Sequence, residues 1–160
     1  MSEILDFGCA VGFLVDAFNG LGYFCRGYDK SSWAVEYGTK MNVQNLTTDY
    51  NDSVKAWWCG RRMTLALDVF EHMTPVEVRK VLLDVNTTYL TVRIPVCAND
   101  GEDFVLPVSR NDPTHITCMS KDSWKLLLSE CGFHVVTLLS LNTIWDSPGV
   151  LSAIFYRSLS

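Results

Sequence analysis

The amino-acid sequence predicts an α/β protein whose sheet is parallel over most of its width. Apolar segments typical of strands alternate five times with segments of helical periodicity, and two further strand-like segments close the chain. Several of the strand-like segments end at an Asp or a Gly, as strands do where they meet a loop. Such alternation is typical of parallel sheets that carry helices on both faces.

Each predicted element rests on a local pattern. Residues 11–21 have apolar side chains at a helical period and run into Gly22. Thr74 and Pro75 are a cap residue followed by Pro at the first helical position, and Glu77 stands in the capping-box position. Strands are expected over residues 4–7, 23–28, 43–48, 63–67, 87–94, 133–141 and 150–157. Helices are expected over residues 11–21, 31–41, 51–59, 74–83 and 120–131.

Length, charge and cysteine usage narrow the class of protein. The 160 residues fit one domain, 1–160. The net charge is −5 and no basic cluster is longer than Arg61-Arg62, which argues against a long nucleic-acid duplex as partner, because duplex binding depends on neutralising several phosphates. The sequence has no apolar run long enough to span a membrane, no secretory leader and no CxxC pair among its six cysteines. We therefore expect a reduced, cytoplasmic protein without a membrane partner.

The segment "DFGCAVG", residues 6–12, is expected at the carboxyl end of the first strand, where ligands bind in open α/β sheets. Its glycines do not follow the G-x-G-x-x-G rhythm of dinucleotide-binding loops, because Phe13 stands where the third glycine is expected. No Gly-Lys-Ser/Thr follows either, and the carboxylate of Asp6 would repel an anion. This loop, together with Asp29 at the end of the second strand, suits a ligand that carries an amine, a ribose and little negative charge.

Five segments together resemble class I S-adenosylmethionine-dependent methyltransferases of the small-molecule type. "ILDFGCAVG" is similar to their first motif, "GYDKS" and "TTDY" to the acidic motifs after the second and third strands, and "ALDVFEHM" to the fourth-strand motif. "DPTHITCMSKDSWKLLLSECGF" resembles their late segment, in which a His precedes a helix. The resemblance covers about residues 4–133. It implies a Rossmann-like three-layer sandwich with a seven-stranded, mostly parallel sheet whose last strand is antiparallel.

The resemblance also implies how the cofactor, S-adenosylmethionine, is held. Asp29 would accept hydrogen bonds from both ribose hydroxyls, and Asp49 would accept one from the adenine amino group. Asp6 and the Gly8 carbonyl would hold the ammonium, and Ala10 departs from the usual glycine, at a cost if the position needs positive φ. Asp29 also has a plain alternative as a turn residue at a strand end. The full set of implied cofactor-binding residues is Asp6, Gly8, Cys9, Ala10, Gly12, Asp29, Lys30, Asp49, Tyr50, Asp68 and Phe70.

His115 and His72 are the candidate catalytic residues, because a hydroxyl or protonated amine acceptor needs a base and His titrates near neutral pH. The alternative for Glu71-His72 is a solvated helix cap. No Asp-Asp-Asn metal cluster is visible, so we predict a metal-independent enzyme with no metal site. Neither the Asn/Asp-Pro-Pro-Tyr/Phe motif nor the Pro-Cys pair of DNA-modifying relatives follows the fourth strand. We therefore expect methyl transfer to an O or N atom of a small molecule, such as a sugar or a hydroxylated or carboxylated metabolite.

Three alternatives stay open: an inactive cofactor-binding or scaffold protein, an RNA or protein methyltransferase, and a nucleotide-binding oxidoreductase. Only Met1-Ser-Glu precede the first strand, so we expect the N-terminal cover helices of the family to be missing and the cofactor pocket to be open. Residues 97–114 form a long connection that contains the apolar run Phe104-Val-Leu. We expect this segment to fold over the substrate side of the site or to dock on a second subunit in a homodimer.

Overall fold

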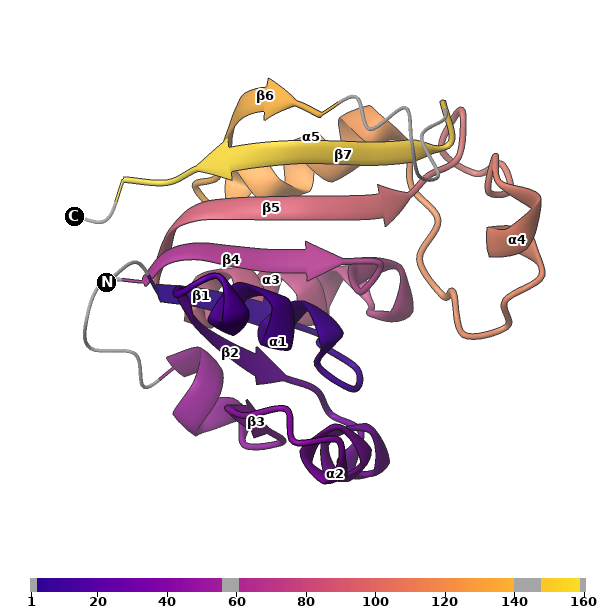
Figure 1. Ribbon diagram of the computed structural model, residues 1–160. Coiled ribbons are helices and arrows are strands. Elements are labelled where there is room, and N and C mark those ends of the chain that lie inside the picture. Colours follow the sequence, from indigo (N-terminus) through magenta and orange to yellow (C-terminus); the bar gives the residue numbers. More distant parts are fainter. Residues whose placement is uncertain (1–2, 56–60, 140–147, 159–160) are drawn as a thin grey trace.

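The computed structural model describes residues 3–55, 61–139 and 148–158. Its centre is one seven-stranded sheet, with the strands in the order β3-β2-β1-β4-β5-β7-β6 (Figure 1). The strands are β1 (Glu3–Phe7), β2 (Phe24–Tyr28), β3 (Leu46–Thr47), β4 (Arg61–Leu67), β5 (Thr87–Pro95), β6 (His134–Leu138) and β7 (Val150–Tyr156).

The strand directions confirm the predicted mixed sheet. β1 pairs in parallel with β2 and β4, β2 with β3, and β4 with β5. Only β7 runs the other way, antiparallel to both β5 and β6. The order places β1 and β4 side by side in the middle of the sheet, so the loops that follow them lie next to each other.

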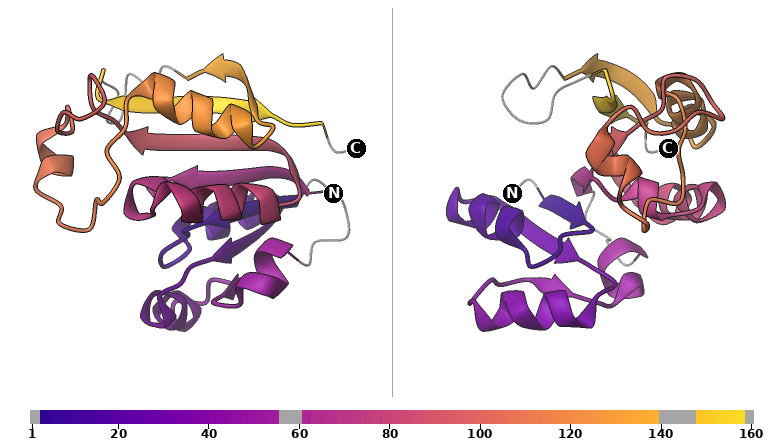
Figure 2. Two further views of the ribbon diagram at one scale, coloured as in Figure 1. Left: turned by 180° about the vertical axis from the view of Figure 1, so that it is seen from behind. Right: turned by 90° about the vertical axis from the view of Figure 1, so that its right-hand side faces the viewer.

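Helices cover both faces of the sheet. α1 lies in front of β1 in Figure 1, and α3 and α5 lie behind β4, β5 and β7, as the reverse view in Figure 2 shows. The helices are α1 (Phe13–Gly20), α2 (Ser32–Lys40), α3 (Pro75–Asp84), α4 (Pro107–Arg110) and α5 (Lys121–Glu130), with a π-helical turn η1 (Asn51–Lys55) and a 3₁₀ turn η2 (Phe70–His72).

The starts of the helices follow the sequence signals. Thr74 accepts a hydrogen bond from the Glu77 amide, and the Glu77 side chain accepts one from the Thr74 amide, which completes the predicted capping box of α3. Ser31 and Ser120 cap α2 and α5 in the same way, each accepting a hydrogen bond from an amide three residues on. α3 therefore begins at a fixed point directly after η2.

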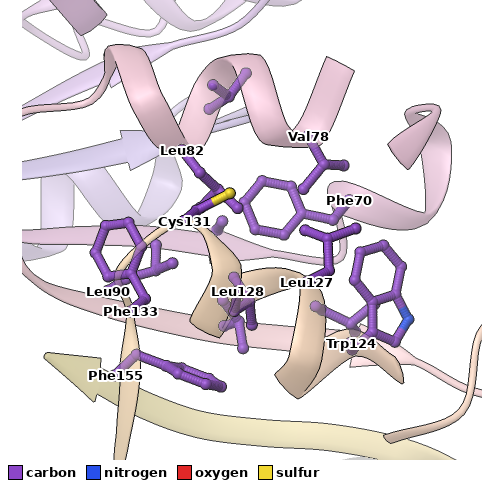
Figure 3. Packing of buried hydrophobic residues seen from close by; sticks show 14 of the residues in the cluster. Phe70, Val78, Leu82, Leu90, Trp124, Leu127, Leu128, Cys131, Phe133 and Phe155 are labelled. Atoms are coloured by element: carbon purple, nitrogen blue, oxygen red, sulfur yellow. The ribbon is translucent and has the colours of Figure 1, made fainter. Parts of the chain in front are cut away.

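The larger core cluster lies between the sheet and the pair α3 and α5 (Figure 3). Phe70 and Trp124 stack there with ring centroids 6.4 Å apart, and Phe133 and Phe155 are fully buried. A smaller cluster around Val15 and Cys25 packs on the α1 side. The five cysteines in the described ranges are free thiols.

Within residues 3–55, 61–139 and 148–158, no helix covers the face of β5 and β7 that points toward the viewer in Figure 1. Tyr89 and Tyr156 pair across the two strands on this face and are 37% and 40% exposed. Among the helices of the described ranges, none is both long and apolar enough to cross a membrane.

Three elements differ most from their predicted bounds. The third strand shrinks from 43–48 to two residues, because Asn45 just before it adopts a left-handed conformation with φ 65°. The helix expected over 51–59 is a π-helical turn as far as Lys55, and 56–60 lie outside the described residues. The strand expected over 133–141 ends at Leu138, and 140–141 also lie outside them.

Candidate functional site

The larger of two neighbouring pockets opens where β1, β2 and β4 end. Its volume is about 540 Å³. The segments that follow these three strands supply most of the lining, and η2, α3 and the segment before α5 close it from the side. The pocket is lined by Phe7, Gly8, Ala10, Tyr28, Asp29, Lys30, Tyr50, Asp68, Val69, His72, Met73, Glu77, Val81 and Thr114.

The loop after β1 needs its glycines for two reasons. Gly8 and Gly12 have φ values of 83° and 86°, a region that L side chains rarely adopt. A Cβ at Gly8 would also lie 2.4 Å from Cγ2 of Val69, and one at Gly12 would lie 2.6 Å from Cδ2 of Leu46. Ala10 between them has φ 49°, so the departure from the usual glycine falls at a position that does need positive φ.

Asp29 fastens this loop to the end of β2. Its Oδ2 accepts a hydrogen bond from the Ala10 amide at 2.8 Å, and its Oδ1 accepts one from the Ser31 amide at 2.9 Å. A carboxylate has about four lone-pair positions, so two backbone donors leave acceptor capacity on the side that lines the pocket. Asp29 therefore orders the loop and still offers the pocket a negatively charged acceptor.

Asp6 lies behind the loop, near the end of β1. It is 5% exposed. Burial raises the pKa of its carboxyl to about 7, and the nearby charge of Asp29 adds to the shift. Asp29 lines the pocket and Asp6 lies close behind it, so the site favours a positively charged group, because a cation there would stabilise both ionised forms.

The structure divides the predicted cofactor residues into two sets. Those that line the larger pocket are Gly8, Ala10, Asp29, Lys30, Tyr50 and Asp68. Those that do not are Asp6, Cys9, Gly12, Asp49 and Phe70.

The second set has other places in the fold. Phe70 is 1% exposed and belongs to the larger core cluster, because η2 turns its ring inward onto Trp124. Cys9 is buried in the smaller cluster. Asp49 is exposed at the start of η1, where its Oδ1 accepts hydrogen bonds from the amides of Asn51 and Asp52.

A smaller pocket of about 210 Å³ lies beyond the larger one, toward β5 and α4. Asp68 lines both pockets and forms an ion pair with Arg93 of β5. The segment 97–114 borders this second pocket, in the region of α4 at the right of Figure 1. The smaller pocket is lined by Asp68, Glu71, Arg93, Pro95, Leu106, Val108, Ser109, Asp112 and His115.

The two predicted catalytic histidines meet between the pockets, around a residue that we did not include in the predicted site. His72 lines the larger pocket and His115 the smaller one, and their ring centroids are 4.6 Å apart. Nε2 of each imidazole lies 4.0 Å from Oε1 of Glu71. Glu71, His72 and His115 are called the Glu71 cluster below.

Backbone hydrogen bonds bring this cluster together from distant parts of the sequence. The carbonyl of Glu71 accepts hydrogen bonds from the amides of Ile116 and Thr117, at 2.9 and 3.0 Å. The Thr117 hydroxyl donates to the Met73 carbonyl at 2.6 Å. These bonds join η2 to the segment before α5 and fix His115 beside His72.

The Glu71 side chain is fully buried, and neither carboxylate oxygen has a hydrogen-bond partner. Burial raises the pKa of Glu71 to about 8, with a smaller contribution from the charge of Asp68. The nearby amide of its own backbone and the charge of Arg93 act in the opposite direction. An unpartnered buried carboxyl costs free energy, so this position is unusual for a residue with only a structural role.

Other lining residues of the two pockets were not predicted either, among them Tyr28, Met73, Thr114 and Arg93. Tyr28 stacks on Phe7 at 5.3 Å and meets Tyr50 edge-on at 5.6 Å, so these rings form an aromatic side of the larger pocket. Its position at the last residue of β2 was the available signal, because ligands gather at the carboxyl ends of the strands. Arg93 carries the same signal near the end of β5.

Comparison with solved structures shows which known proteins have a similar fold. No protein-family model and no curated protein matches the sequence. A methyltransferase from Archaeoglobus fulgidus described as SAM-dependent has a similar structure, with a TM-score of 0.69, 16% identity and coverage of 98% of this chain and 86% of the other. A SAM-dependent methyltransferase of Methanosarcina mazei gives a TM-score of 0.71 at 17% identity, with 99% and 93% covered.

A third structure, mitomycin 7-O-methyltransferase, gives a TM-score of 0.73 at 13% identity. The match covers 98% of this chain but only 49% of that enzyme, so this chain spans about half its length. The chain therefore has the Rossmann-like fold of class I S-adenosylmethionine-dependent methyltransferases, and the fold that the sequence motifs implied is confirmed.

Proposed function

We propose that the protein binds S-adenosylmethionine in the larger pocket and transfers its methyl group to an O or N atom of a small molecule. The observation that carries the proposal is the glycine loop after β1, fastened by Asp29 at the mouth of a 540 Å³ pocket on a methyltransferase fold. Pockets for small ligands usually measure about 300–1,000 Å³, so the volume suits a ligand of this size.

The residues of the pocket match the chemical groups of this cofactor. Asp29 has acceptor capacity for the ribose hydroxyls, and Tyr28 and Tyr50 offer aromatic surface to the adenine. Asp6 and the Gly8 carbonyl lie on the side where an ammonium group would be favourable. The cofactor itself supplies a methyl group on a positively charged sulfur. The chain's own task is to hold the acceptor close and in line with that methyl group.

The acceptor side is the smaller pocket with the Glu71 cluster at its boundary. Its volume of about 210 Å³ favours a small acceptor or one end of a larger one. His72 and His115 are the proposed catalytic residues, because their Nε2 atoms lie at the boundary between the two pockets. They can act directly, by taking the acceptor's proton, or by holding a group that does so. The methyl carbon bonds to the acceptor atom as its bond to sulfur breaks, and sulfur keeps the electron pair.

Titration calorimetry with S-adenosylmethionine, S-adenosylhomocysteine and NAD tests the first step. We expect saturable binding of the first two and none of NAD. Tight NAD binding without a response to S-adenosylhomocysteine would contradict the proposal and favour an oxidoreductase. Incubation with methyl-labelled cofactor and a metabolite mixture tests the second step, since cofactor binding without any labelled product would favour an inactive binding protein.

A further inference from the structure

The orientation of the two imidazoles in the Glu71 cluster can be read from their hydrogen bonds. Nδ1 of His115 lies 3.1 Å from the Ser109 carbonyl, which can only accept, so Nδ1 carries the hydrogen. Nδ1 of His72 lies 3.2 Å from the Thr114 carbonyl, and the Thr114 hydroxyl gives its own hydrogen to Asp112. Nδ1 of His72 is therefore the donor as well.

With the hydrogen at Nδ1, the lone pair of each Nε2 is available to a ligand, and both Nε2 atoms lie near the same carboxylate oxygen, Oε1 of Glu71. Each Nε2 is 4.0 Å from that oxygen, and all three atoms lie within 4.8 Å of one another. Three acceptor atoms that face one another in this way repel, unless a proton or a cation lies among them. Glu71 has no other partner for either oxygen and is completely buried.

We propose that Glu71, His72 and His115 bind a divalent first-row transition-metal cation. Two histidines and one carboxylate are a common ligand set for such ions, and a set of three leaves coordination positions open for other molecules. The hydrogen bonds at Nδ1 are of the kind that orient metal-bound histidines through their second nitrogen. The Asp112 carboxylate, 3.6 Å from Nε2 of His115, is the nearest further acidic group at the rim.

The distances set a condition on binding. Metal–nitrogen and metal–oxygen bonds to zinc measure about 2.0–2.2 Å. Two atoms that are 4.0 Å apart can thus share one ion only from nearly opposite sides of it. Three ligands cannot all lie on opposite sides, so the three side chains must move closer to one another, by about 1 Å or less. His72 is 31% exposed at its side chain, and this exposure leaves room for the movement.

The role of the ion rests on the proposed function. A cation at this boundary would bind an acceptor oxygen from the smaller pocket and lower the pKa of its hydroxyl. The proton would leave to water through the open pocket. The oxygen would then form a bond to the methyl carbon while the carbon–sulfur bond breaks. We had predicted metal independence because no Asp-Asp-Asn cluster is visible, and this site would use a different ligand set.

Metal binding can be measured without any acceptor. Untagged protein, freed of metal with a chelator and then of the chelator, would be titrated with Co²⁺ followed by visible absorption and with Mn²⁺ followed by electron paramagnetic resonance. We expect one ion per chain. Glu71→Gln and His115→Gln should each weaken binding at least ~10-fold, because even residues that only support metal ligands contribute about 10–100-fold.

His134→Gln is the matched control, since His134 lies on β6 and is exposed, and it should bind the ion as the unaltered protein does. Far-ultraviolet circular dichroism would check folding, and His72→Gln, at the more exposed ligand, replaces any variant that fails to fold. An unaltered protein that binds no ion saturably, or equal affinity in the Glu71 and His115 variants, would overturn the inference. S-adenosylhomocysteine binding, measured separately, tells failure of this site from failure of the proposed function.

Discussion

Asp6 and Glu71 are both buried carboxyl groups at the same edge of the sheet, one near the end of β1 and one just beyond the end of the neighbouring β4. Their surroundings differ. Asp6 has a second acid, Asp29, nearby on the side of the larger pocket. Glu71 has two imidazole nitrogens opposite one of its oxygens and no hydrogen-bond partner at either.

Asp6 and Glu71 illustrate two arrangements of side chains that favour the binding of a positively charged group. On the proposed cofactor side, the Asp29 carboxylate lines a wide pocket and the buried carboxyl of Asp6 lies behind it, which suits an organic ammonium or sulfonium group. On the acceptor side, one carboxylate and two lone pairs converge on a point, which suits a single ion. In both places a nearby cation would favour the ionised form of the carboxyl group.

Asp6→Asn gives the largest expected effect. The folded-state pKa of Asp6 is raised from 3.8 to about 7, so its contribution to stability is fully present below about pH 4 and is lost as the pH rises through about 7. One pKa unit corresponds to about 1.4 kcal/mol, so at pH 8 the variant should be more stable than the unaltered protein by a few kcal/mol. Urea unfolding from pH 4 to pH 8 measures this difference, in the absence of ligand.

Two results would tell against that account of Asp6. One is a pH dependence of unfolding that is the same in the variant and in the unaltered protein. The other is unchanged affinity for S-adenosylhomocysteine in Asp6→Asn, because the proposed cofactor site uses the negative charge of Asp6 to hold the ammonium group.

Asp29→Ala should weaken S-adenosylhomocysteine binding by about 2–3 kcal/mol, since hydrogen bonds to a charged acceptor contribute about that much. The loop after β1 also loses the acceptor of the Ala10 amide. Asp29→Asn is the matched variant, because it keeps one oxygen acceptor and removes the charge. Calorimetry should rank the affinities as unaltered, then Asn, then Ala. An unchanged dissociation constant in folded Asp29→Ala would mean that another residue binds the ribose. The contrast between Asp29 on the cofactor side and Glu71 on the acceptor side would then be wrong.

Ala10→Gly gives the smallest effect. Ala10 has φ 49°, and a left-handed conformation costs a residue with a Cβ about 1 kcal/mol or somewhat more. The variant should raise the free energy of unfolding by about 1 kcal/mol and leave Co²⁺ binding unchanged, because Ala10 lines only the larger pocket. Thermal and urea unfolding would measure the gain, and a loss of stability would mean that the alanine methyl makes contacts worth more than its strain.

Much of the fold follows from patterns within short segments. The capping box at Thr74 and Glu77 and the glycines at 8 and 12 act over a few residues, so the sequence alone places α3 and the loop after β1. Asp29 was predicted for the ribose. Its hydrogen bond to the Ala10 amide was not, because that contact depends on how β1 and β2 pair.

The direction in which a side chain points was harder to predict. Phe70 and His72 belong to one quoted motif, but the 3₁₀ turn sends Phe70 into the core and His72 to the larger pocket. The Glu71 cluster could not be predicted from the sequence for a related reason. His115 is far from His72 in the sequence, and only the backbone bonds of Ile116 and Thr117 to Glu71 bring it near.

Asp68 lines both pockets and pairs with Arg93, and this shared side chain has a thermodynamic consequence. A molecule that binds in one pocket and moves the Asp68 side chain changes the free energy of binding in the other pocket. Such coupling is reciprocal. If an ion at the Glu71 cluster raises the affinity for S-adenosylhomocysteine by some factor, S-adenosylhomocysteine must raise the affinity for the ion by the same factor. The coupling could then be measured in either direction, as a change in the affinity for one molecule when the concentration of the other is varied.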